Sequence, residues 1–248
     1  MLERQYISEV ILSQPVKEDS YLSTLPVVRH LSECGSLSLG HSVTFFVGEN
    51  GTGKSTLLEA IAVAFGFNPE GGTKNFNFAT SGTHSELFRH ITLAKSKFPQ
   101  DGFFLRAESF YNTASYIEAL DREPSALPPL IESYGGVSLH KQSHGESFLS
   151  LVQNRFGGKG VYILDEPEAA LSPSRLLVLM AEMQALVEKD SQFIIATHSP
   201  ILMTFPGAEI YAFSQEGVAS VSYRETEHYQ LTRRFLENPE QILRYLFE

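Results

Sequence analysis

The segment VTFFVGENGTGKST, residues 43–56, decides how this chain folds. Its opening residues, 43–47, are apolar or β-branched and predict a buried strand. Residues 48–55 then fit the pattern G-x-x-x-x-G-K-[ST]. Apolar residues at helical spacing follow over 57–65, and Gly66 ends that helix. A glycine-rich turn between a strand and a helix is the setting in which this pattern binds phosphate; a purely structural turn is the alternative.

The glycine-rich stretch has the groups that a nucleotide needs. Glycines let backbone N–H groups face the phosphates, and the N-terminus of the following helix adds its positive end. Lys54 is expected to reach the β- and γ-phosphates, and the Ser55 hydroxyl to ligate Mg²⁺. The residues expected to bind ATP here are Glu49, Asn50, Gly51, Thr52, Gly53, Lys54, Ser55 and Thr56.

Two adjacent carboxylates close a second apolar strand. Residues 161–164 are apolar, and Asp165, Glu166 and a proline follow. An acidic strand end is often only a solvated edge, but it gains meaning downstream of a phosphate loop. We expect Asp165 to hold Mg²⁺ through its waters. Glu166 would orient and polarise the attacking water as general base.

The remaining pattern predicts an α/β fold with a mostly parallel sheet and helices on both faces. A helix beginning at Ser172-Pro173 precedes a third apolar strand, 193–196, which ends at Thr197-His198. Farther on, a hairpin is expected around Glu216-Gly217, followed by a terminal helix from about 229 to 247 that breaks near Pro239.

Four motifs follow one another along the chain: residues 48–55, then SHGES at 143–147, ILDEP at 163–167 and ATH at 196–198. Together they resemble the ordered motif set of the ABC ATPase superfamily. The resemblance implies a P-loop NTPase fold with an inserted small helical lobe and an antiparallel N-terminal β element. It also implies hydrolysis of ATP with Mg²⁺. His198 matches the switch histidine of that superfamily, which contacts the γ-phosphate and the catalytic glutamate.

The SHGES motif is similar to the Leu-Ser-Gly-Gly-Gln/Glu signature and opens a predicted helix over 146–156. By that resemblance, Ser143, Gly145 and Glu146 would receive the γ-phosphate of ATP held by an opposite subunit. The sequence departs from the usual signature, because His144 replaces its first glycine and Gln142 its leading leucine. Ser172 likewise replaces the usual aspartate of the neighbouring D-loop.

The chain is expected to form one domain over 1–248, with a nucleotide-binding core from 1–66 and 143–248. The intervening 67–142 would be the helical lobe, with a short helix near 85–93 and one core strand at about 103–108. The family's lobe carries a metal-sensing glutamine at the end of that strand. Here Glu108 would replace that glutamine as a metal contact. Two alternatives stay open: Arg106 would pair with Glu108 for a purely structural purpose, or Gln100, which lies nearby, would be the metal-sensing residue. Tyr21 is placed suitably to stack on the adenine base, and an ordinary structural role for this tyrosine is an equal alternative.

The branch of the superfamily follows from spacing. Lys54 and Ser143 are 89 residues apart, which leaves room for a lobe but not for long coiled-coil arms. The chain most resembles small stand-alone AAA/ABC-type ATPases inferred in bacteria, an SMC-like head without arms. That resemblance implies an ATP-dependent homodimer that drives an unidentified protein partner. Alternatives are the nucleotide-binding subunit of an ABC transporter with a membrane permease, a component of nucleic-acid maintenance or defence, and a P-loop kinase.

Composition sets the remaining bounds. The 248 residues carry a formal net charge of −10 and 42% hydrophobic residues, so strong nonspecific binding to nucleic acid is not favoured. Apolar runs are too short to span a membrane and no signal peptide is recognised, so a cytoplasmic location is expected. The single cysteine, Cys34, is expected to be a small buried side chain. Histidines besides those in the motifs, namely His30, His41, His84, His90, His140 and His228, show no metal-ligand spacing.

Overall fold

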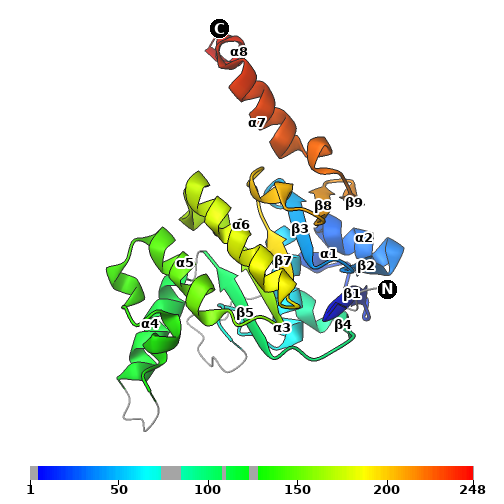
Figure 1. Cartoon of the computed structure of the whole chain (residues 1–248). Helices are drawn as coiled ribbons and strands as arrows, with labels where there is room; N and C mark the ends of the chain where they lie inside the picture. The colour runs from blue at the N-terminus through cyan, green and yellow to red at the C-terminus, as the bar shows by residue number, and fades with distance from the viewer. Residues whose placement is uncertain (1–4, 74–84, 108–109, 123–127, 248) are drawn as a thin grey trace.

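The computed structural model describes residues 5–73, 85–107, 110–122 and 128–247. A layered α/β body carries two C-terminal helices that project away from it (Figure 1). In the described part of the chain, no helix is long and apolar enough to cross a membrane. The predicted α/β class with a mostly parallel sheet is confirmed.

The main sheet has six strands in the order β5-β6-β7-β3-β8-β9 within the described residues. Neighbours from β5 to β8 run parallel, and β9 closes the edge antiparallel to β8. The bounds are β3 Val43–Gly48, β5 Asp101–Arg106, β6 Gly160–Asp165, β7 Gln192–Ala196, β8 Glu209–Ser214 and β9 Gly217–Ser220. The strands predicted at 43–47, 161–164 and 193–196 lie side by side in this sheet, as does the lobe's predicted core strand.

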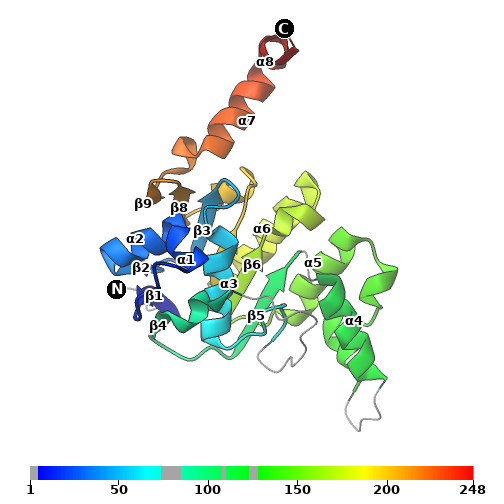
Figure 2. The same cartoon turned by 180° about the vertical axis from the view of Figure 1, so that it is seen from behind.

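Both faces of the main sheet are buried. On β6, Tyr162 and Leu164 pack into one hydrophobic core, while Val161 and Ile163 pack into the other. This alternation follows from the two-residue period of a strand, and it explains why the strand sequences are apolar throughout. Figure 2 shows α3 against the face opposite to that covered by α5 and α6.

Helices of the described chain are α1 Tyr21–Thr24, α2 Pro26–Cys34, α3 Lys54–Phe65, α4 Phe110–Asp121, α5 His144–Arg155, α6 Pro173–Glu188, α7 Glu227–Glu237 and α8 Pro239–Phe247. Short 3₁₀ turns are η1 Glu86–Arg89, η2 Leu130–Tyr134, η3 Leu139–Lys141, η4 Pro167–Ala170, η5 Leu202–Thr204 and η6 Tyr223–Glu225. The predicted terminal helix is present and breaks at Pro239, as expected from the missing N–H of proline. Cys34 is exposed, so the expectation of a buried cysteine is wrong: it is the last residue of α2, one turn beyond the buried Leu31.

A second, antiparallel sheet has the order β2-β1-β4, with β1 Ile7–Leu12, β2 Ser36–Ser38 and β4 Ile91–Lys95. The predicted helix near 85–93 is therefore wrong beyond Arg89, because Ile91–Lys95 pairs with β1 instead. The buried Gln192 joins the two sheets. Its side chain accepts from the Ile7 N–H (2.9 Å) and donates to the carbonyl oxygens of Ile7 (2.8 Å) and Leu39 (3.0 Å).

Candidate nucleotide-binding and catalytic site

The predicted motifs meet at the carboxyl ends of β3, β6 and β7. In parallel strands these ends lie at one edge of the sheet, where open α/β sheets bind ligands. Phe46 of β3 is in register with Ala196 of β7, which is in register with Asp165 of β6. The phosphate loop, the acidic pair and His198 therefore leave the sheet next to one another.

The loop between β3 and α3 has the backbone conformation that phosphate binding needs. Gly48, Gly51 and Gly53 all have positive φ (132°, 82° and 95°), which L-residues with side chains rarely adopt. At Gly48 a Cβ would lie 2.1 Å from the carbonyl oxygen of Phe213, so glycine is required there on steric grounds as well. Thr52 fixes the turn by donating from Oγ1 to the Glu49 carbonyl (2.8 Å). Glu49, Asn50 and Gly51 form the exposed tip.

Lys54, the first residue of α3, is buried beneath this tip. Its Nζ donates to the carbonyl oxygens of Gly48 (2.6 Å) and Glu49 (2.8 Å), which holds the ammonium inside the loop. Burial lowers the pKa of Lys54, while the carboxylates of Glu166 and Asp165 act in the opposite direction. The two carbonyl contacts place the Lys54 ammonium directly beneath the tip of the loop.

Next to Lys54, Ser55 contacts the acidic strand end. Its Oγ donates to Oδ1 of Asp165 (3.1 Å), whose side chain is 9% exposed. A hydroxyl and a carboxylate oxygen are the hard ligands that Mg²⁺ prefers, with water and phosphate completing its shell. Among the described residues, no group of three or more His, Cys, Asp or Glu is placed to hold a metal by itself. Ser55 and Asp165 therefore fit a Mg²⁺ site.

Arg106, at the end of β5, belongs to the same cluster and was not predicted as part of it. Its Nη1 lies 2.7 Å from Oε2 of Glu59 on α3, and its Nε lies 3.5 Å from Oδ2 of Asp165. Glu108, the predicted metal contact, lies outside the described residues. Gln100 precedes β5 and so lies at the end of that strand remote from Asp165, where it cannot take the metal-sensing role.

Glu166 has an unusual backbone that sets its side chain apart from that of Asp165. Its φ and ψ of 49° and 53° are left-handed, although it is not glycine. Its N–H donates to the Ala196 carbonyl (2.9 Å), and Pro167 begins η4 directly afterwards. The side chain is 40% exposed, with Oε1 at 3.6 Å from Nε2 of His198. The two neighbouring carboxylates therefore face different partners.

The loop that carries His198 is held by Glu168. One Glu168 oxygen accepts from Oγ1 of Thr197 (2.8 Å) and the other from the backbone N–H of His198. The Thr197 hydroxyl in turn accepts from the Ser199 N–H (3.0 Å). These contacts fix the loop after β7, so the imidazole of His198 stands over Glu166.

The predicted signature forms the N-terminus of α5. Glu146 folds back on Ser143, accepting from its N–H (3.0 Å) and its Oγ (2.7 Å), which is a capping arrangement. These hydrogen bonds from Ser143 lower the pKa of Glu146, and Arg175 acts in the same direction. Arg175, on α6, donates to Ser143 Oγ (3.2 Å) and Glu146 (3.1 Å), and none of the predicted motifs includes it. A Cβ on Gly145 would lie 2.9 Å from the Ala170 carbonyl oxygen, so this signature glycine lets α5 approach η4 closely.

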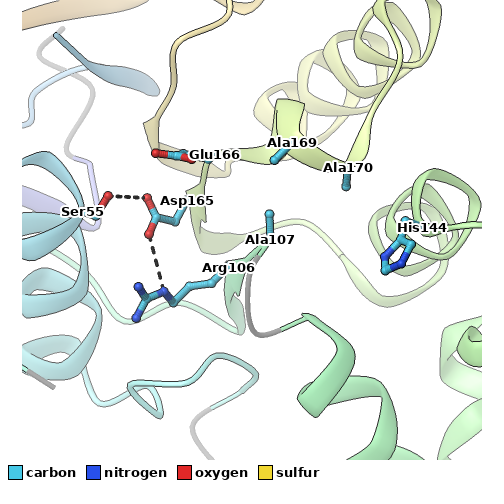
Figure 3. A pocket seen from close by; sticks show the side chains of 8 residues that line it. All are labelled: Ser55, Arg106, Ala107, His144, Asp165, Glu166, Ala169 and Ala170. Atoms are coloured by element: carbon cyan, nitrogen blue, oxygen red, sulfur yellow. Dashed lines mark hydrogen bonds and ion pairs between the residues drawn. The ribbon is translucent and has the colours of Figure 1, made fainter. Parts of the chain in front are cut away.

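A cavity of about 270 Å³ connects these parts within one chain. Figure 3 shows Ser55, Asp165, Arg106 and Glu166 on one side and His144 on the other, with two alanines of η4 between them. Ser172, the D-loop residue, is the N-cap position of α6 and its Oγ lies 3.1 Å from Oγ of Ser174. Tyr21 is exposed, and its hydroxyl donates to Oγ of Ser85 (3.1 Å), which leaves both readings of this tyrosine open.

Comparisons with known proteins agree with this geometry. One family model, described as "AAA domain", matches residues 29–116, and a second, described as "AAA domain, putative AbiEii toxin, Type IV TA system", matches residues 137–204. A search of the curated proteins finds no match.

One solved structure that resembles the chain is the SMC head domain from Thermotoga maritima. The two sequences are 16% identical, the match covers 88% of this chain and 99% of that one, and the TM-score is 0.47. Another is cbiO1 from Clostridium perfringens, part of the ABC transporter complex cbiONQ, with 17% identity, 95% and 97% covered, and a TM-score of 0.49. Both family models describe an AAA domain: the first covers the phosphate loop, and the second covers the acidic strand end and His198.

Proposed function

We propose that the chain is a molecular switch that binds ATP with Mg²⁺, closes head to tail with a second copy, and hydrolyses the nucleotide to drive a partner protein. The observation that carries this proposal is the meeting of three motifs in one place. Ser55 contacts Asp165 at the foot of the phosphate loop, and Glu166 faces His198 beside it.

In the proposed complex, the loop N–H groups and Lys54 bind the phosphates of ATP. Ser55 and Asp165 would hold Mg²⁺, which supplies neutralising charge to the β- and γ-phosphate oxygens. Glu166 accepts a proton from water while the water oxygen attacks the γ-phosphorus. The bond from that phosphorus to the β–γ bridging oxygen breaks, and ADP and phosphate result.

The second half of the site would come from another copy of the chain. Ser143 lies exposed at the N-terminus of α5, where the helix dipole favours an anion. Arg175 adds a guanidinium 3.2 Å from Oγ of Ser143, although Glu146 shares that cation. A γ-phosphate bound to one copy would compete with Glu146 for these donors. Closure would therefore depend on ATP.

A Glu166→Gln variant tests the proposal. It should bind ATP and Mg²⁺ but hydrolyse ATP at least about 100-fold more slowly, because general-base catalysis is worth 10²–10⁴-fold. Glu240→Gln makes the same change on the exposed α8 and should hydrolyse ATP at the wild-type rate. Light scattering after gel filtration should show that Glu166→Gln is a monomer without ATP and a dimer with ATP and Mg²⁺. Wild-type hydrolysis by Glu166→Gln removes its base role, and a mass that ignores ATP rejects the dimer.

A further inference from the structure

His228, which none of the motifs includes, lies against the switch histidine. Its Nε2 is 3.0 Å from Nδ1 of His198, and the two ring centroids are 5.1 Å apart with planes tilted by 55°. The other ring nitrogen of His198, Nε2, is 3.6 Å from Oε1 of Glu166. Glu166, His198 and His228 therefore form a continuous chain of side chains that starts at the proposed general base.

The contact with His228 decides where the proton of a neutral His198 resides. A carboxylate only accepts hydrogen bonds, so the Glu166 contact favours an N–H on Nε2 of His198. Nδ1 of His198 must then accept, and the Nε2–H of His228 is the donor that lies within reach. In the opposite tautomer, a lone pair on His198 would face the carboxylate.

The surroundings of His228 favour the neutral ring that this arrangement needs. Burial lowers the pKa of His228, and the charges of His198 and Lys54 act in the same direction, while Glu227 opposes them. The ring is half-buried beside the exposed tip of the phosphate loop, in a cavity of about 430 Å³ that Asn50 and His198 also line.

His228 reaches this position from α7, in the part of the chain that projects from the body (Figures 1 and 2). The first turn of α7 is anchored: Thr226 is buried and caps the helix, and the rings of Tyr223 and Tyr229 are 4.6 Å apart. From Leu231 to Glu240 every residue is exposed. His228 thus lies in the first turn of α7, beside the nucleotide-binding body.

We propose that His228 is a positioning residue for His198: it holds the switch imidazole in the tautomer and orientation that face Glu166, and so links the projecting helices to ATP hydrolysis. This inference rests on the proposed ATPase function. A displacement of α7 would remove the donor from Nδ1 of His198 without altering the phosphate loop, so hydrolysis would slow while ATP binding persists.

The test compares steady-state ATP hydrolysis of His228→Leu, His228→Gln and wild type. Removing a group that orients a functional histidine typically costs 10–100-fold, so kcat of His228→Leu should fall by about that factor with KM for ATP unchanged. Glutamine keeps an N–H donor at the end of its side chain and should restore part of kcat. Thr232→Ala, one turn farther along α7, is the matched control and should behave as wild type. Thermal unfolding of each variant verifies that it is folded.

A double-mutant cycle separates positioning from a general structural effect. In a His198→Ala background, His228→Leu should cause no further loss, because the ring that it positions is gone. Equal losses in both backgrounds would overturn the inference, as would an unchanged kcat or a raised KM in the single variant. If Glu166→Gln arrests hydrolysis but His228→Leu does not slow it, only this inference fails. If the wild type hydrolyses no ATP, the proposed function fails and takes this inference with it.

Discussion

Replacing Glu166 by glycine should leave the fold more stable than replacing it by alanine. Both changes remove the same carboxylate, its contact with His198 and its repulsion from Asp165, so their difference isolates the backbone. At φ 49° and ψ 53°, a residue with a Cβ pays roughly 1–2 kcal/mol for the left-handed conformation. Glycine avoids that cost but loses roughly 0.5–1 kcal/mol more conformational freedom on folding. The net preference is about 1 kcal/mol in favour of glycine.

For a domain of this size, about 1 kcal/mol corresponds to roughly 2–4 °C in the midpoint of thermal unfolding. Calorimetry of Glu166→Gly and Glu166→Ala should therefore show the glycine variant melting higher by that amount, and neither variant should hydrolyse ATP. If alanine melts at the same temperature or above, the backbone at position 166 is not held left-handed in solution. The explanation of why Glu166 and Asp165 face different partners would then be refuted.

Two further predictions concern the framework of the site. Gln192→Leu should lower the free energy of unfolding by about 2–4 kcal/mol, because buried backbone groups of Ile7 and Leu39 lose their hydrogen-bond partner. Urea unfolding measures this change, and an unchanged free energy would mean that the Gln192 amide makes no net contribution to stability. Burial would raise the pKa of Asp101, but the Gly157 N–H and the neighbouring Arg155 outweigh it and hold that pKa below the ordinary 3.8. The unfolded chain then binds the proton more readily than the folded one, so the free energy of unfolding should fall as pH drops below about 5. This loss should be smaller in Asp101→Asn. Parallel curves of unfolding free energy against pH for the two proteins would contradict the prediction.

Local sequence was sufficient wherever one continuous segment determines its own structure. The phosphate loop is such a case, because Gly48 and Gly53 meet backbone demands that the flanking strand and helix create. The central strands were predictable since both of their faces are buried, which makes them apolar throughout.

Predictions failed or were absent where a distant segment decides. Leu87 and Ile91 are four residues apart and suit a helix, yet Ile91–Lys95 becomes a strand because β1, which lies far earlier in the chain, offers it an antiparallel edge. Arg106 and Arg175 join the site through tertiary contacts alone. Neither residue belongs to a motif or lies at a distance from one that would predict its place in the site. His228 is another such case.

Three carboxylates at the end of β6 and just after it, Asp165, Glu166 and Glu168, differ in their partners, and this difference supports different roles for them. Asp165 is nearly buried between Ser55 and Arg106, a position suited to holding a cation beside bound phosphate. Both oxygens of Glu168 accept hydrogen bonds from the loop that carries His198, so this residue serves the structure of the site. Glu166 remains open to solvent, with His198 at 3.6 Å, and water can reach it. A residue that must take a proton from water needs that access, which is why, of the three, Glu166 is the one that we propose as the general base.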